Sequence, residues 1–137
     1  MLIDEIINLI NQGESNQLEF KSMLPPVEIV ARNIAAFANS EGGLLVIGVN
    51  DNGEIIGISD DTLASSVVES SLLRLNPKPE VNHTYVSKND KQLYVIEVKK
   101  SLEVVLTENQ TVYLRQGPAV FRANAKEATK LINEKTW

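Results

Sequence analysis

The sequence predicts one α+β domain in which helices flank a mixed β-sheet. Three observations lead to this fold class. A chain of 137 residues suits a single compact domain. Its 43% hydrophobic and 23% charged residues are typical of a globular protein. Its apolar residues recur at helical spacing in some segments and in short strand-like runs in others. We therefore expect residues 1–137 to form one domain.

The first third of the chain predicts a helix, a strand and a second helix. Isoleucines recur at helical spacing in residues 2–12, which indicates a short amphipathic helix that ends at Gly13. Residues 18–21 alternate apolar and polar side chains, the pattern of a half-buried strand. Pro25-Pro26 then breaks the chain, and an apolar face at helical spacing predicts a helix from there to Asn39.

The middle of the chain predicts a central strand, a hairpin and a third helix. Residues 44–49 are continuously apolar, as in a strand that is covered on both faces. Residues 50–54 contain an Asn-Gly turn, so we expect residues 55–58 to return as the second strand of a hairpin. We expect a helix over residues 60–76. Its first two residues are aspartates, and acidic side chains are favourable at the positive, N-terminal end of a helix.

The second half of the chain predicts four strands and a last helix. The strands form two pairs, residues 81–86 with 92–98 and residues 111–115 with 119–122. Asn124 and Glu127 have the spacing of a capping box at the start of a helix. The expected order of elements is therefore αβαββαββββα.

Composition excludes several classes of protein. The chain has no Cys, which excludes a disulfide scaffold, a thiolate zinc site and a Cys nucleophile. The chain has a single histidine, His83, so a metal site with several histidines is excluded. His83 lies on a predicted strand, where a hydrogen-bonded histidine at the surface or sheet edge is favoured over a catalytic general base. No apolar run is long enough to span a membrane, and the first residues lack the basic region of a signal peptide. We therefore expect a soluble cytoplasmic protein without membrane contact.

Charge is divided unevenly along the chain. Residues 1–77 contain three basic and eleven acidic side chains, whereas residues 78–126 contain eight basic and five acidic side chains. An acidic half joined to a basic half is compatible with a cation bound beside a polyanion. The same pattern also arises by chance on a solvated surface, and both interpretations stay open.

Three acidic residues, Glu14, Glu19 and Asp51, are candidate metal ligands. Glu19 and Lys21 are two apart on a predicted strand, so their side chains share one face. Glu14 precedes that strand, and Asp51 lies in the predicted hairpin turn. Carboxylates are the ligands that Mg²⁺ or Mn²⁺ prefers. The alternative is a solvated Glu-Lys pair and an ordinary turn aspartate.

Four basic residues are candidate contacts to a phosphate backbone. They lie in the basic half of the chain: Lys99, Lys100, Arg115 and Arg122. Few aromatic residues accompany them, which gives little support to a base-stacking platform. Gly42-Gly43 suggests a phosphate loop, but the Walker motif is absent. We therefore expect these glycines to end a helix and allow close backbone packing, with no ATP bound.

Three segments together resemble the Schlafen-type AlbA domain. Residues 14–21 read ESNQLEFK and resemble its E-x-x-x-x-E-F-K opening. Residues 36–53 read AFANSEGGLLVIGVNDNG and resemble its A-F-A-N-t-x-G-G-x-l-x-i-G-V-x-D core. Residues 112–117, followed by Phe121-Arg122, resemble its later strand pair. The resemblance covers about residues 13–127.

The resemblance implies nucleic-acid binding and, in some members, metal-dependent cleavage of tRNA and rRNA. It implies a catalytic acidic triad at Glu14, Glu19 and Asp51, with Lys21 as the adjoining basic residue. Mg²⁺ or Mn²⁺ is then the expected cofactor, and RNA or DNA the expected partner. Other members of the family are described as DNA-binding or transcription-regulator modules, so a non-catalytic function is the alternative.

The chain also departs from the family pattern. Active Schlafen cores resemble two copies of this fold plus a zinc site, whereas this chain has one copy and no Cys, so we expect no zinc. A second lobe would have to come from another chain, which predicts a homodimer. Strands that contain Tyr94, Val112 and Phe121 are the expected contact, and a bare dimerisation module is a third hypothesis.

Overall fold

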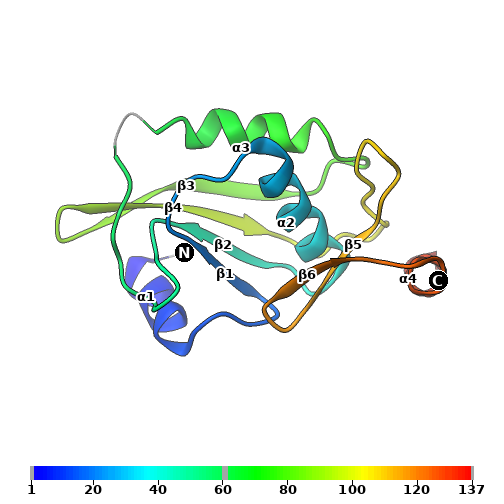
Figure 1. Ribbon diagram of the computed structural model, residues 1–137, viewed down its shortest axis with the longest axis horizontal. Coiled ribbons are helices and arrows are strands. Elements are labelled where there is room, and N and C mark those ends of the chain that lie inside the picture. Colours follow the sequence, from blue (N-terminus) through cyan, green and yellow to red (C-terminus); the bar gives the residue numbers. More distant parts are fainter. Residues whose placement is uncertain (1, 60–61, 137) are drawn as a thin grey trace.

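The computed structural model describes residues 2–59 and 62–136. It confirms a single α+β domain with a mixed sheet (Figure 1). The elements are α1 (Ile3–Gln12), β1 (Leu18–Lys21), α2 (Val27–Asn39), β2 (Gly43–Ile47), α3 (Ala64–Leu72), β3 (Val81–Lys88), β4 (Lys91–Val98), β5 (Tyr113–Gln116), β6 (Ala119–Arg122) and α4 (Ala125–Thr136). In this described part of the chain, no helix has the length and apolarity needed to cross a bilayer.

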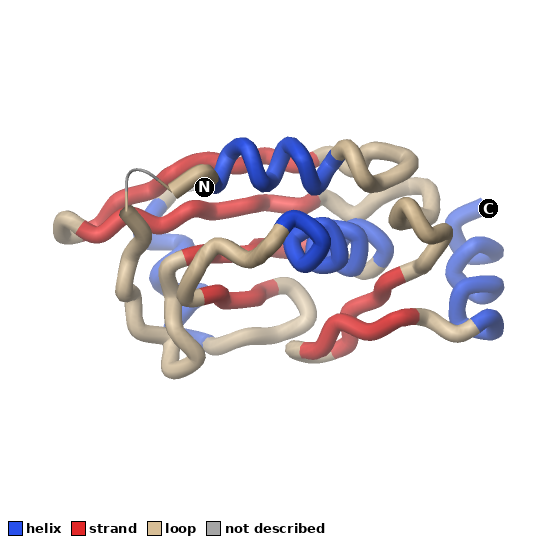
Figure 2. The backbone as a smooth tube through the Cα atoms, turned by 45° about the horizontal axis from the view of Figure 1, so that its top comes forward, coloured by secondary structure: helices blue, strands red, loops and turns tan. Residues whose placement is uncertain are grey.

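Four strands form the main sheet in the order β1-β2-β4-β3. Strand β1 runs parallel to β2, while β2 with β4 and β4 with β3 are antiparallel pairs. Strand β1 therefore forms one edge of the sheet, and β2 lies inside it. Strands β5 and β6 form a separate two-stranded sheet, and β5 packs on α2 (Figure 2).

Helices cover both faces of the main sheet. Helices α2 and α3 pack on the face that presents Leu45 and Ile47 of β2. Helix α1 packs on the opposite face, where Leu44 and Val46 lie. All four of these β2 side chains are buried, which confirms the expectation of a central strand covered on both faces.

The hairpin expected after β2 is reduced to its turn. Residues 55–58 form no strand, and Val49 and Ile55 make one isolated bridge. Both edges of β2 are already occupied by β1 and β4, so a returning strand has no free edge along most of its length. The chain turns away at Gly57, which has a positive φ of 77°, and the Ile58 amide bonds to the Gln92 carbonyl at 2.8 Å. The observed order is accordingly αβαβαββββα.

Helix α3 is shorter than expected. It begins at Ala64, and the aspartates expected at its start, Asp60 and Asp61, lie outside the described residues. It ends at Leu72, where short-range turns at Arg74 and Leu75 replace helical hydrogen bonds.

Gly42-Gly43 acts as expected of a helix stop beside a tightly packed strand. Gly42 has a φ of 73°, and a Cβ on it would lie 2.8 Å from the Val98 carbonyl oxygen. A Cβ on Gly43 would lie 2.6 Å from both the Gln17 carbonyl oxygen and the Phe37 ring. Only glycine leaves room for α2 to pass into β2 here.

Buried Asn39, at the end of α2, ties the second half of the chain to the first. Its side-chain amide donates to the carbonyls of Val105 and Tyr113 at 2.9 and 3.0 Å. Its side-chain oxygen accepts the Val105 amide at 2.7 Å. The neighbouring Ser40 hydroxyl accepts the Arg115 amide at 3.1 Å. These bonds hold the loop before β5, and β5 itself, against α2.

Helix α4 begins with the predicted capping box. The Asn124 side chain accepts the Glu127 amide at 2.8 Å, and the Glu127 carboxylate accepts the Asn124 amide at 2.9 Å. The helix lies at the end of the molecule that carries the C-terminus (Figure 1).

Candidate functional site

The free edge of β1 is covered by side chains instead of another strand. Because β1 bonds to β2 through alternate residues, Leu18 C=O and Phe20 N–H point away from the sheet. A Glu14 carboxylate oxygen accepts the Phe20 amide at 2.9 Å. An Arg115 Nη2 group donates to the Leu18 carbonyl at 2.8 Å. These two side chains block pairing of this edge with another strand.

Arg115 is the centre of a buried network. Its Nη1 donates to Glu19 Oε1 at 2.8 Å, and its Nε donates to the Ser15 carbonyl at 2.9 Å. Its guanidinium carbon lies 4.7 Å from the centre of the Phe37 ring. The Arg115 side chain has no exposed surface, and the Glu19 side chain is 11% exposed. Each guanidinium nitrogen thus has an acceptor, as a buried cation requires.

Glu14 and Glu19 meet beside this network. Burial raises the pKa of Glu14 above its usual value of 4.5, and the hydrogen bond to Glu19 raises the pKa further. The Phe20 amide and Arg115 act in the opposite direction. On the other side, Lys21 Nζ lies 3.6 Å from Glu19 Oε2 and its side chain is 36% exposed. The predicted shared face of Glu19 and Lys21 is therefore confirmed, and Glu14 completes a carboxyl pair.

Asp51 lies near this pair but outside it. It is exposed in the turn after β2, where the Asn50 side chain accepts the amides of Asn52 and Glu54. Asp51 and Glu14 line the same cavity of about 250 Å³. Among residues 2–59 and 62–136, no three His, Cys, Asp or Glu side chains form a group that could hold a metal ion. The structure thus joins two of the three acidic candidates directly and places the third across a cavity from Glu14.

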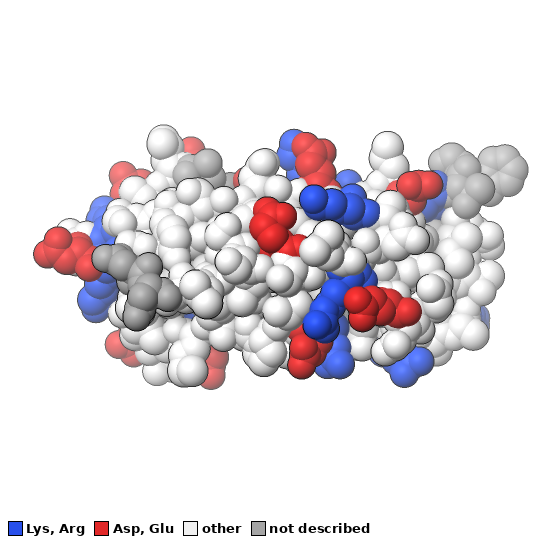
Figure 3. Space-filling model, turned by 90° about the horizontal axis from the view of Figure 1, so that it is seen from above, with Lys and Arg blue, Asp and Glu red and all other residues white. Residues whose placement is uncertain are grey.

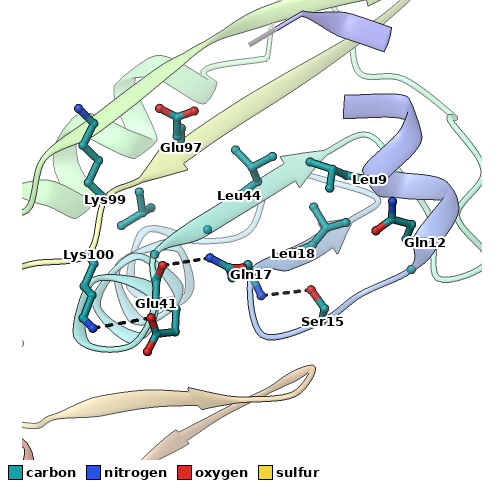
Figure 4. Close-up of a pocket in the computed structure, with 14 residues that line it drawn as sticks. Leu9, Gln12, Ser15, Gln17, Leu18, Glu41, Leu44, Glu97, Lys99 and Lys100 are labelled. Atoms are coloured by element: carbon teal, nitrogen blue, oxygen red, sulfur yellow. Dashed lines mark hydrogen bonds and ion pairs between the residues drawn. The ribbon is translucent and has the colours of Figure 1, made fainter. Parts of the chain in front are cut away.

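Lys99 and Lys100 lie at a separate groove of about 580 Å³ (Figure 4). Apolar side chains from α1, β1 and β2, namely Leu9, Leu18 and Leu44, line its wall. Lys99 forms an ion pair with Glu80 at 3.1 Å, and Lys100 forms one with Glu41 at 3.7 Å. Both lysines are more than half exposed, so they remain accessible at the rim.

Two sequence-based expectations about the second half are wrong. Arg115 has no exposed surface from which to contact a phosphate backbone, and each of its three guanidinium nitrogens donates to an acceptor inside the molecule. Tyr94 and Val112 are buried, so they offer no apolar surface to a partner. Arg122, by contrast, is exposed on β6 as expected.

The Arg115–Glu19 ion pair is the feature that sequence reasoning missed. The two residues are 96 positions apart, and neither the spacing nor the charge pattern links them. His83 also has partners that were not foreseen. It bonds to Tyr94 through Nδ1, and its Nε2 lies 2.8 Å from a Glu69 carboxylate oxygen. These contacts agree with the interpretation of His83 as a satisfied histidine at the edge strand β3.

Comparison with known proteins agrees with this arrangement. The family model described as "Schlafen, AlbA_2" matches residues 14–124, which include the carboxyl pair, Asp51 and Arg115. The chain belongs to the Schlafen AlbA_2 family. The match begins at Glu14 and ends at Asn124, the first residue of the capping box of α4.

Two solved structures are similar to this AlbA_2 domain. The DIP2311 protein from Corynebacterium diphtheriae is 18% identical, with a TM-score of 0.65 over 90% of this chain and 26% of that protein. The N-terminal domain of a protein from Nitrosomonas europaea, which is described as related to the ATP-dependent DNA helicase RecG, is 24% identical. That match has a TM-score of 0.49 and covers 70% of this chain and 71% of the other. This chain therefore spans about a quarter of the DIP2311 protein, and the similarity to that protein establishes the fold.

We predict that Arg115→Met lowers the free energy of unfolding by about 3–5 kcal/mol, because it leaves the buried Glu19 carboxylate without its cation. Urea unfolding of the single variant, of Glu19→Gln and of the double variant measures the effect. The double variant should lose less stability than the sum of the two single losses. Additive losses, or an Arg115→Met protein as stable as the wild type, would contradict the buried pair.

We predict that Glu14→Gln stabilises the protein at neutral pH. A carboxyl whose pKa is raised in the folded state favours the protonated form, so its contribution to stability falls as the pH rises above 4.5 through the raised pKa. Glutamine keeps an acceptor for the Phe20 amide but carries no charge. Urea unfolding should show an advantage of the variant at pH 7.5 that shrinks toward pH 4.5, and an advantage that is independent of pH would refute the assignment.

Proposed function

We propose that this domain binds nucleic acid and cleaves RNA with the help of a divalent cation, Mg²⁺ or Mn²⁺. The observation that carries the proposal is the pairing of Glu14 and Glu19 at the edge of β1, beside the exposed amine of Lys21. Membership of the AlbA_2 family supports it. The resemblance to Schlafen-type domains implies metal-dependent cleavage of RNA by some members.

The residues present fit a divalent cation. Mg²⁺ commonly binds one or two carboxylates and keeps several waters. Glu14 and Glu19 supply two carboxyl groups, and a cation between them would offset the burial and, to a smaller extent, the Glu19 charge that raise the pKa of Glu14. Asp51 would act through water, because it shares the 250 Å³ cavity with Glu14. When bound, the cation would stabilise negative charge on the scissile phosphate.

The side chains of this site would divide the chemistry among them. Glu14, as the more exposed carboxyl of the pair and the one whose pKa is raised, would accept a proton from the attacking hydroxyl group or water. Lys21 would neutralise a non-bridging phosphate oxygen, since its amine is partly exposed beside Glu19. Arg115 would keep the Glu19 carboxylate in one orientation from inside the molecule. Lys99, Lys100 and Arg122 would contact the phosphate backbone outside the site.

A non-catalytic DNA-binding or regulatory module is the second candidate. It is favoured by the bonds that already occupy Glu19, which contacts Arg115 at 2.8 Å and Lys21 at 3.6 Å. In this function the carboxyl pair would stabilise the β1 edge, and the exposed cations alone would contact DNA.

One experiment separates the two candidates. Purified protein is incubated with tRNA or duplex DNA in Mg²⁺, Mn²⁺ or EDTA, and cleavage is followed on gels while binding is followed by anisotropy. We expect cleavage of tRNA with metal only, and loss of at least about 100-fold in rate for Glu14→Gln and Asp51→Asn, since catalytic carboxylates contribute about that much or more. Lys99→Ala/Lys100→Ala should weaken binding and flatten its salt dependence. Binding of DNA without cleavage under any condition would identify the second candidate.

We also propose that the domain pairs as a homodimer. An apolar surface on the loop after β4 and on α4 supports this, because Leu102 is 88% and Ile132 is 48% exposed. Half-buried Val104 and Leu106 line a hollow of about 500 Å³ beside Ile132. Light scattering should give about twice the monomer mass of 15.1 kDa, and Leu102→Glu/Ile132→Glu should return it to the monomer mass. A wild type that is monomeric at all concentrations would reject the dimer.

A further inference from the structure

The four arginines of the chain divide into two groups. Arg115 is paired with Glu19, and Arg74 lies 3.7 Å from Glu28. Arg32 and Arg122, in contrast, are exposed and make no ion pair with a carboxylate within the described ranges. An arginine without a carboxylate partner keeps its fork of N–H donors available to an external anion.

Both of these arginines lie beside Tyr113. The Arg32 guanidinium carbon, on α2, is 5.5 Å from the centre of the Tyr113 ring. Arg122 is the direct cross-strand partner of Tyr113 in the β5–β6 pair, so the two side chains stand on the same face of the hairpin. Arg32 and Arg122, which are 81 and 9 positions away from Tyr113 in the sequence, are therefore brought to one aromatic ring by the packing of β5 on α2.

A small cleft opens next to this ring. It has a volume of about 100 Å³, which is roughly the space of three water molecules and suits one phosphate group. Arg32, Arg74 and Tyr113 line it together with side-chain donors of the loop before β5, among them Asn109. Figure 3 views the molecule from above and shows basic and acidic side chains side by side near the middle of this face.

We infer that Arg32, Arg122 and Tyr113 form a phosphate-binding patch that holds a single nucleic-acid strand. The inference rests on the proposed function and goes beyond it, because it assigns the main backbone contact to α2 and the β5–β6 hairpin. Arginine binds phosphate through two parallel N–H groups, and the Tyr113 ring supports the Arg32 side chain from one face.

The charges around the patch favour it over the Lys99–Lys100 groove. Glu28 and Glu108 also line the cleft, and Glu28 is engaged by Arg74. Glu108 stands in the cleft with Arg32 and Arg74, whereas Arg122 lies outside the cleft lining; neither Arg32 nor Arg122 forms an ion pair among the described residues. Lys99 and Lys100 are each already paired with a glutamate, which a phosphate would have to displace.

Strand β5 connects the patch to the carboxyl pair. Tyr113 and Arg115 are two residues apart on the same face of β5, a rise of about 6.6 Å. Arg115 in turn contacts Glu19 directly. Tyr113 is therefore linked through one internal residue, Arg115, to the carboxyl pair of Glu14 and Glu19.

Binding of an unstructured fluorescent RNA oligonucleotide, and of its DNA counterpart, tests the patch. Anisotropy is measured in EDTA over a range of NaCl concentrations, so that no cleavage occurs. For Arg32→Gln/Arg122→Gln we expect at least about tenfold weaker binding at low salt. The slope of log K against log salt should fall by about 1.4, because each lost phosphate contact on a single strand removes about 0.7. Similar loss on RNA and DNA identifies a backbone contact, whereas loss on RNA alone points to the 2′-hydroxyl.

Matched variants serve as controls. Lys88→Gln/Lys91→Gln removes the same charge at the β3–β4 turn and should change affinity less than about twofold. Arg32→Lys/Arg122→Lys keeps the charge and should restore the salt slope, which excludes misfolding as the cause. Urea unfolding of each variant verifies the fold.

The outcomes separate this inference from the proposed function. If wild type binds tRNA or duplex DNA but neither oligonucleotide, the patch is wrong while the proposed function stands; if it binds none of the four, both are overturned. If wild type binds and Arg32→Gln/Arg122→Gln binds equally well with the same salt slope, the patch is wrong while the proposed function stands. If inorganic phosphate alone displaces the oligonucleotide at low millimolar concentration, the cleft is a free-anion site and the strand contact is rejected.

Discussion

The ion pair between Arg115 and Glu19 is the interaction on which the rest of the structure depends. It joins β5, which belongs to the small sheet, to the edge strand of the main sheet. A guanidinium with no exposed surface is tolerated only because Glu19, Ser15 and Leu18 accept its donors and the Phe37 ring covers it. Removing one acceptor would leave a buried charge, so this part of the molecule forms as a unit.

The same network sets the electrostatics of the candidate site. Glu14 lies in a partly desolvated place, beside the Glu19 carboxyl group that Arg115 fixes in position. That arrangement raises the pKa of Glu14 and makes the pair receptive to either a proton or a divalent cation. A structural ion pair and a candidate chemical site thus share one residue, Glu19, and neither role can be altered without the other.

The exposed positive charge lies around the carboxyl pair, not within it. The partly exposed amine of Lys21 lies beside Glu19. Arg32 and Arg122 lie next to Tyr113, two residues before Arg115 on β5. The acidic and basic halves of the sequence are therefore interleaved in space by the packing of β5 and β6 on α2. This placement gives an acidic chain a local surface that suits a polyanion.

The sequence alone determined the fold class, most element positions and the shared face of Glu19 and Lys21, because these depend on local periodicity and turn chemistry. The capping box at Asn124 and the helix stop at Gly42-Gly43 were predictable for the same reason. Only the tertiary structure decided that residues 55–58 form no strand, because that outcome depends on β1 and β4 already occupying both edges of β2. It alone decided that Arg115 is internal, since no local pattern links side chains 96 residues apart. The positions of charges relative to one another are set by long-range packing, and in this protein long-range packing determines which cations are free to bind.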